Sequence, residues 1–256
     1  MLRLVELRKR FGDATVVDGL TLEVARGERL VLLGGSGSGK TTTLKMVNRL
    51  IEPDGGRVEL DGVDVAALAP HALRRRIGYC FQQVGLFPHM TVGENVGVTP
   101  RLLGWPDERV AARVDELLDL VELAPARFRD RAPASLSGGQ QQRVGVARAI
   151  AAQPSVLLLD EPFGALDPLT RERLQQSFLA IARRLDLTAI FVTHDVLEAL
   201  VVADRIAVLN DGRVEQIDAP SALMARPATE YVRRLLAAPL RGLAALRADA
   251  QPPGRA

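Results

Sequence analysis

A glycine-rich stretch near the N-terminus carries the clearest chemistry in the sequence. It matches the pattern G-x-x-x-x-G-K-[ST], whose backbone N–H groups fold around a phosphate at the start of a helix. In such a loop the Lys40 ammonium group reaches the β- and γ-phosphates, and the Thr41 hydroxyl holds Mg²⁺. A flexible Gly/Ser linker is the alternative, but this stretch follows a strand and opens a helix, as the pattern requires. The candidate ligands are Gly34, Gly35, Ser36, Gly37, Ser38, Gly39, Lys40, Thr41 and Thr42.

Two adjacent acids, Asp160 and Glu161, end the apolar run 156–159. At the carboxyl edge of a parallel sheet, such a position lies beside the phosphate loop. We expect Asp160 to bind Mg²⁺, directly or through water, and Glu161 to polarise the water that attacks the γ-phosphate. Because any solvated strand end can carry acids, this interpretation depends on the phosphate loop.

A second short Gly-rich turn comprises Ser137, Gly138, Gly139 and Gln140 and leads into a helix. The helix N-terminus offers another place where an anion can bind. The simpler interpretation is a helix capped by Ser137. Both can hold, because a cap and an anion site share the same geometry.

With Leu136 this turn reads LSGGQ, and together with the phosphate loop and the acid pair it strongly resembles the ATP-binding cassette (ABC) ATPases. The resemblance covers about residues 2–237. It implies ATP and Mg²⁺ as ligands. It also implies a homodimer in the ATP-bound state, in which the signature turn of one subunit completes the site of the other.

Further family elements follow in the expected order. Gln82 resembles the glutamine that senses Mg²⁺ and water, although the neighbouring Gln83 leaves its position ambiguous by one residue. Asp167 lies in a sequence similar to the family's D-loop, and His194 matches the switch histidine. A histidine after a strand is more often a satisfied polar residue, so its catalytic role rests on the family pattern.

Phe11 stands where the family stacks an aromatic ring on adenine, and Val16 is a candidate to share that contact. Phe11 could equally belong to the core.

The segment 81–105 is similar to the osmoprotectant branch of ABC importers, which take up glycine betaine, choline, carnitine or related quaternary amines. In importers this region forms a groove for the membrane subunit, and Phe87, Pro88 and Met90 are apolar residues suited to it. Local packing of the helices is the alternative. The resemblance implies two transmembrane permease subunits, an extracytoplasmic solute-binding protein and a peripheral location at the cytoplasmic face of the membrane. An importer of amino acids or another small solute, or an exporter, is the competing function.

Many ATPases of that branch continue into a regulatory module of the cystathionine-synthase type. The sequence stops at Ala256, so we expect no osmotic gating by such a module. The solute itself is not predicted, because in this family the solute contacts lie in other subunits.

Composition excludes several other classes of protein. The 33 Lys and Arg residues nearly balance 31 Asp and Glu residues, so no charge excess indicates nucleic acid as a partner. Cys80 is the single cysteine, which excludes an intrachain disulfide and a Cys-based zinc site. The N-terminus lacks a signal-peptide pattern, and no apolar run approaches the roughly 20 residues that span a bilayer. No lysine follows an asparagine, as guanine recognition by a GTPase would require.

The order of strand and helix signals along the sequence indicates an α/β protein with a mostly parallel sheet, which would position these residues. Continuous apolar runs predict buried strands, and a second set of strands is expected to be more antiparallel; Asn210–Arg213 reads as a hairpin turn. Helical spacing or motif context predicts three helices in the first part of the chain and its middle. The expected buried strands are 29–33, 77–81, 156–159 and 189–193, the second set is 5–8, 20–24, 57–60 and 205–209, and the helices are 41–50, 107–121 and 139–152.

The predicted architecture is a P-loop nucleotide hydrolase core with an antiparallel β subdomain and an inserted α-helical subdomain. We expect one ATPase domain over residues 1–237. Its core is about 1–92 and 153–218, its helical insertion about 93–152 and its C-terminal helix about 219–237. The tail, 238–256, is rich in Pro, Gly and Ala and is expected to be partly disordered.

Overall fold

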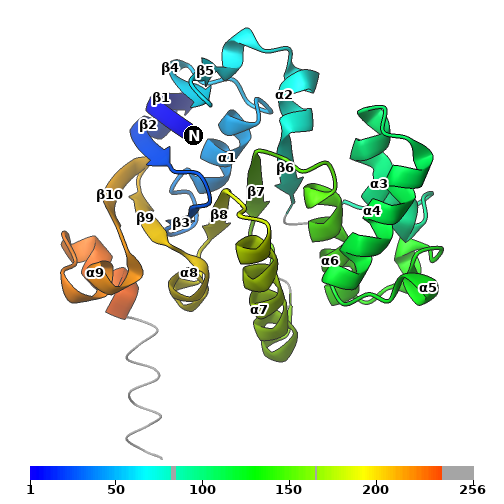
Figure 1. Ribbon diagram of the computed structural model, residues 1–256. Coiled ribbons are helices and arrows are strands. Elements are labelled where there is room, and N and C mark those ends of the chain that lie inside the picture. Colours follow the sequence, from blue (N-terminus) through cyan, green and yellow to red (C-terminus); the bar gives the residue numbers. More distant parts are fainter. Residues whose placement is uncertain (82–84, 165, 238–256) are drawn as a thin grey trace, which may run out of the picture.

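Two β-sheets and a group of helices form the computed structural model, which describes residues 1–81, 85–164 and 166–237 (Figure 1). In spatial order the larger sheet contains β10 (Arg213–Asp218), β9 (Arg205–Asn210), β3 (Arg29–Leu33), β8 (Ala189–Thr193), β7 (Val156–Asp160) and β6 (Ile77–Cys80). The smaller sheet contains β2 (Ala14–Val24), β1 (Leu2–Phe11), β4 (Gly55–Leu60) and β5 (Val63–Asp64). All pairs in the smaller sheet are antiparallel, whereas β9, β3, β8, β7 and β6 pair in parallel.

The central strands of the larger sheet are buried on both faces, which is why they read as continuous apolar runs. Along β3, Leu30 and Leu32 point into the core shared with the smaller sheet, while Val31 and Leu33 point into the core under the helices. The predicted α/β class with a mostly parallel sheet is therefore confirmed.

The expectation that residues 205–209 belong with the antiparallel set is wrong in part. The strand β9 lies in the larger sheet, parallel to β3 on one side and antiparallel to β10 on the other. Its buried run Ile206–Leu209 has the two-sided burial of a central strand. The expected hairpin does join β9 to β10, and Asp211 and Gly212 both adopt positive φ values there.

One helix, α1 (Lys40–Val47), contributes Leu44, Met46 and Val47 to the core between the two sheets (Figure 1). On the other face, α7 (Pro168–Arg184) and α8 (Val196–Val202) follow β7 and β8 in the chain. Both were missed from sequence, as was α2 (Pro70–Arg76) before β6.

The chain between the neighbouring strands β6 and β7 is helical, as expected. It contains α3 (Val92–Leu102), α4 (Asp107–Leu120), α5 (Pro125–Phe128), a short 3-10 turn (Pro133–Ser135) and α6 (Gly138–Ile150). These helices lie to one side of the larger sheet in Figure 1. The strand β6 ends at Cys80 rather than at Phe81, a residue that is 42% exposed.

At the C-terminal end, the expected helix 219–237 is interrupted: α9 (Pro220–Ala225) is followed by the non-helical residues 226–229 and then by a helix over residues 230–237. The tail 238–256 lies outside the described residues. Within the described ranges, no helix combines the length and the apolar character that crossing a membrane requires.

Candidate functional site

Three neighbouring strands bring the predicted site residues to one edge of the larger sheet. The strands β3, β8 and β7 are adjacent and parallel, with Leu33 beside Thr193 and Asp160 beside Val192. The phosphate loop follows β3, His194 follows β8, and Glu161 follows β7. The predicted position of the acid pair beside the phosphate loop therefore matches the sheet order.

The glycines of the phosphate loop are needed where the backbone passes close to other strands. Gly39 has a φ of +92°, and a Cβ there would lie 2.6 Å from the Val16 carbonyl oxygen. A Cβ at Gly34 would lie 2.2 Å from the carbonyl oxygen of Leu209. Because Gly39 provides no side-chain cap for α1, the first N–H groups of this helix are free of a capping side chain.

The side chain of Lys40 folds back over its own loop. Its Nζ donates to the carbonyl oxygens of Gly34, at 2.9 Å, and Gly35, at 2.7 Å, and to Ser38 Oγ at 3.2 Å. Burial lowers the pKa of Lys40, while the carboxylates of Glu161 and Asp160 act in the opposite direction. The loop thus holds an ammonium group where the motif places the terminal phosphates.

Thr41 and Asp160 meet across the edge of the sheet. The Thr41 hydroxyl donates to Asp160 Oδ1 at 2.9 Å, and burial raises the pKa of Asp160 while this hydrogen bond opposes the shift. A hydroxyl and a carboxylate beside a phosphate loop fit Mg²⁺, which takes oxygen ligands and completes its shell with phosphates and water. These two residues would hold the ion.

Glu161 and His194 form a second pair at this edge. Glu161 Oε1 lies 3.0 Å from His194 Nδ1, and the Glu161 N–H donates to the Val192 carbonyl oxygen at 2.9 Å. The φ of Glu161 is +45°, which is rare for a residue with a side chain and typical of strained functional positions. The structure thus brings together the two residues predicted to support hydrolysis.

The predicted adenine contacts lie on the smaller sheet. Phe11 ends β1 and is 49% exposed, so Phe11 is not a core residue. Lys9 Nζ lies 5.5 Å from the ring centroid. The carbonyl oxygen of Val16 lies beside Gly39 of the phosphate loop. An exposed ring is available for stacking.

The signature turn is a capped helix start, as the simpler interpretation predicted. Ser137 Oγ accepts from the Gln140 N–H at 3.3 Å, and Gln140 Oε1 accepts from the Ser137 N–H at 3.0 Å. The helix that follows, α6, packs against α3, α4 and β6, whereas α1 packs against β2, β7 and β8. Within one chain the signature turn and the phosphate loop thus belong to different parts of the fold.

The signature turn instead neighbours the start of α7. A Cβ at Gly139 would lie 2.8 Å from Thr170 Cγ2. Asp167 caps α7 by accepting from the Thr170 N–H at 3.0 Å, and the hydrogen bonds from Thr170 lower the pKa of Asp167. Gln82, the remaining candidate, lies outside the described residues.

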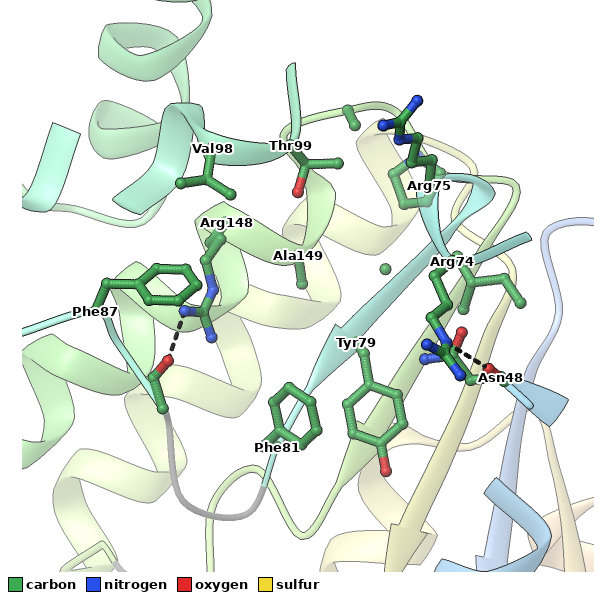
Figure 2. Close-up of a pocket in the computed structure, with 15 residues that line it drawn as sticks. Asn48, Arg74, Arg75, Tyr79, Phe81, Phe87, Val98, Thr99, Arg148 and Ala149 are labelled. Carbon is green, nitrogen blue, oxygen red and sulfur yellow. Dashed lines mark hydrogen bonds between the residues drawn. The ribbon is translucent and has the colours of Figure 1, made fainter. Parts of the chain in front are cut away.

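A cavity of about 270 Å³ opens between β6 and the helices (Figure 2). Of the three loop residues singled out from sequence, Phe87 lines this cavity, but Pro88 and Met90 do not. The buried Asn95 sets the loop conformation, because its side chain bonds both the N–H and the carbonyl oxygen of Phe87. Rings and guanidinium groups line the cavity together: Tyr79, Phe81, Phe87, Arg74, Arg75 and Arg148.

Both tyrosines of the chain touch the site, and sequence reasoning missed both. The Tyr79 hydroxyl donates to Asp160 Oδ2 at 3.4 Å. The Tyr231 hydroxyl, from the helix 230–237, accepts from the Gly35 N–H at 3.2 Å. These contacts join residues that are far apart in the chain. The rarity of tyrosine, which occurs twice in the sequence, was the only feature that could have drawn attention to these two residues.

A phosphate loop at the end of the first parallel strand of a six-stranded sheet places the protein among the P-loop nucleotide-binding proteins. The family model described as "ABC transporter" matches residues 17–164. The chain belongs to this family.

Relatives and solved structures agree with this assignment. The glycine betaine/carnitine/choline transport ATP-binding protein OpuCA of Bacillus subtilis is 48% identical, over 92% of this chain and 62% of its own length. The osmoprotectant import ATP-binding protein OsmV of Salmonella typhimurium is 50% identical, over 91% of this chain and 62% of its own length. The chain thus spans about three fifths of these relatives.

A dimeric post-hydrolysis structure of the ATP-binding cassette MJ0796, bound to ADP and phosphate, superposes with a TM-score of 0.77 at 34% identity. The superposition covers 86% of this chain and 99% of the MJ0796 chain. The predicted P-loop core with two kinds of sheet and inserted helices is the fold of these cassettes.

Proposed function

We propose that this chain is the ATP-hydrolysing, nucleotide-binding subunit of an ABC importer. The observation that carries the proposal is the pairing of Thr41 with Asp160, and of Glu161 with His194, beside the Lys40 loop. Each pair has the residue types that phosphoryl transfer to water needs, at hydrogen-bond distance.

The residues divide the reaction between them. The phosphate loop and Lys40 bind the β- and γ-phosphates, and Phe11 stacks on adenine, with Val16 nearby. Thr41 and Asp160, with Gln82, hold Mg²⁺, which neutralises charge on the phosphates when bound. Glu161 accepts a proton from the attacking water, and His194 orients the Glu161 carboxylate through its Nδ1 contact.

We infer a homodimer in the ATP-bound state. The signature turn, Ser137–Gln140, and Asp167 form one surface around the start of α7, away from the phosphate loop of the same chain. Two copies arranged head-to-tail would place this surface against the partner's ATP. The dimeric state of the MJ0796 structure supports this arrangement.

The cavity of Figure 2 is the proposed docking site for a transmembrane permease subunit, one for each cassette. Its exposed rings, Phe81 and Phe87, suit apolar side chains of a partner, and its arginines suit a carboxylate or a helix C-terminus. Docking there would hold the chain at the cytoplasmic face of the membrane. An extracytoplasmic solute-binding protein would complete the importer.

The proposed solute is a quaternary-amine osmoprotectant such as glycine betaine, choline or carnitine. The support is that OpuCA is named as a glycine betaine/carnitine/choline transport protein and OsmV as an osmoprotectant import protein, together with sequence identities of 48% and 50%.

Two experiments test these proposals separately. Purified chain should hydrolyse Mg-ATP, and Glu161→Gln should retain ATP binding while losing turnover; equal rates for both proteins would refute the residue assignments.

Proteoliposomes containing the chain with its co-purified membrane subunits should take up labelled glycine betaine, choline or carnitine on ATP addition. Uptake of sulfate or an amino acid instead would replace the proposed solute, and efflux would replace import.

A further inference from the structure

Tyr79 lies between the cavity of Figure 2 and the proposed metal site. It lies on β6, and its side chain is largely buried, with 9% of the residue exposed. Its ring lines the cavity of Figure 2, while its hydroxyl donates to Asp160 Oδ2. One side chain therefore touches both this cavity, called the groove below, and the carboxylate proposed to hold Mg²⁺.

On the groove side, Tyr79 packs against an exposed ring. The ring centroids of Tyr79 and Phe81 are 4.3 Å apart, and Figure 2 shows the Tyr79 hydroxyl pointing away from Val98 and Thr99 on α3. An occupant of the groove that pressed on Phe81 would press on Tyr79 as well. Closely packed side chains transmit such displacements because there is little free volume to absorb them.

On the metal side, Asp160 has one donor on each carboxylate oxygen. Thr41 donates to Oδ1 at 2.9 Å and Tyr79 to Oδ2 at 3.4 Å. Two donors from different elements fix the plane of a carboxylate. The Tyr79 bond is longer than the usual O–H···O distance of about 2.7–2.8 Å, so a ring movement of less than about 1 Å would tighten or break it.

We propose that Tyr79 is a positioning residue that links the contents of the groove to the orientation of the Asp160 carboxylate. The link to a membrane partner rests on the proposed function, because that partner is the proposed occupant of the groove. A role for Tyr79 in core packing alone would require only the ring. The hydroxyl is therefore the group to remove.

The first test compares Tyr79→Phe with Phe81→Leu in the full chain. The first change removes only the hydroxyl; the second alters the groove ring and leaves the Asp160 contact in place. Mn²⁺ binding is measured by electron paramagnetic resonance with a non-hydrolysable ATP analogue present, so that the readout is independent of hydrolysis. The affinity of the analogue without metal is measured in parallel.

Tyr79→Phe should weaken Mn²⁺ binding about 3- to 10-fold, the range for loss of one hydrogen bond, with metal-free analogue affinity within about 2-fold of wild type. Phe81→Leu should bind Mn²⁺ within about 2-fold of wild type. Wild-type Mn²⁺ affinity in Tyr79→Phe would overturn the proposal. If Tyr79→Phe does not fold, wild-type protein containing 3-fluorotyrosine is studied by fluorine NMR instead. The Mg²⁺ complex of the ATP analogue is then added without Mn²⁺. A resonance of residue 79 that does not shift on this addition would likewise overturn the proposal.

The second test addresses the groove. In complexes with the co-purified transmembrane subunits, Tyr79→Phe should remain bound but lose at least about 3-fold in the ratio of stimulated to basal ATP hydrolysis. An unchanged ratio would overturn the link. If wild type binds no transmembrane subunit, the proposed function fails instead, and the Mn²⁺ comparison alone decides whether Tyr79 positions Asp160.

Discussion

The phosphate loop and the signature turn are both Gly-rich helix starts, yet they differ in what the chain supplies around them. Lys40 and Asp160 are each only 6% exposed, and strands β7 and β8 carry carboxylates and a histidine beside them. Ser137 and Gly138 are exposed, and the side chains of the turn bond mainly to one another. The first region thus gathers buried charged groups around its helix start, whereas the second is an exposed turn that in the proposed dimer would contact the nucleotide held by another copy.

This difference explains why a single chain carries two potential anion sites. The phosphate loop needs the buried partners that only a sheet edge provides. The signature turn needs only a capped helix start and an open surface, because another copy brings the nucleotide in the proposed dimer. Substitutions in the two regions should therefore have different effects.

The largest effect is expected in the first region, at Glu161. Glu161→Gln should lower kcat about 10³-fold, because the amide cannot take the proton of the attacking water. ATP affinity should change by less than about 3-fold, because Glu161 follows the loop rather than forming it. Steady-state hydrolysis and nucleotide titration measure the two effects, and parallel losses in both would contradict the assigned role.

Lys40→Ala should lower the affinity for ATP about 100-fold, since it removes a charge-assisted contact to the phosphates. Lys45→Ala, on the same helix, is a matched control for general loss of charge. Equilibrium titration with a fluorescent ATP analogue measures both variants. Equal losses in the two would contradict a specific role for Lys40.

A substitution in the signature turn should lower hydrolysis by the dimer and leave ATP binding by the monomer unchanged. Ser137→Ala removes the cap, and should lower hydrolysis about 10-fold at saturating ATP while the ATP affinity of the monomer stays within about 2-fold. The free energy of unfolding should fall by about 1 kcal/mol. A large loss of monomer ATP affinity would mean that the turn serves its own chain.

The smallest effect is expected at Tyr231, which touches the loop from the helix 230–237. Tyr231→Phe removes the acceptor of the Gly35 N–H and keeps the ring. We expect ATP affinity to fall about 2- to 4-fold with kcat unchanged, in line with one exposed hydrogen bond. A fall in kcat at constant affinity would assign the contact to the chemical step instead.

Sequence was sufficient where the residues of one function are contiguous. The phosphate loop and the acid pair carry their own strand and helix contexts, so the contact between Thr41 and Asp160 follows once the strands are parallel. The exposed Phe11 ring also fits its predicted position.

Contacts between distant residues could not be obtained in this way. Tyr79 reads as one more apolar position of a buried strand, and nothing local indicates that its hydroxyl meets Asp160. The sheet membership of β9 depended on pairing partners, which periodicity does not specify. Phe87, Pro88 and Met90 were singled out as apolar loop residues in a segment that resembles the importers, but sequence did not show that Asn95 holds Phe87 at the cavity while Pro88 and Met90 lie outside its lining.

The most direct test of the composite site is the solution mass of Glu161→Gln, measured by light scattering with and without Mg-ATP. We expect a monomer without nucleotide and a dimer with it, and we expect that dimer to be lost when Ser137→Arg is added. A protein that binds ATP and remains monomeric would contradict the account, because the signature turn would then have no ATP to contact.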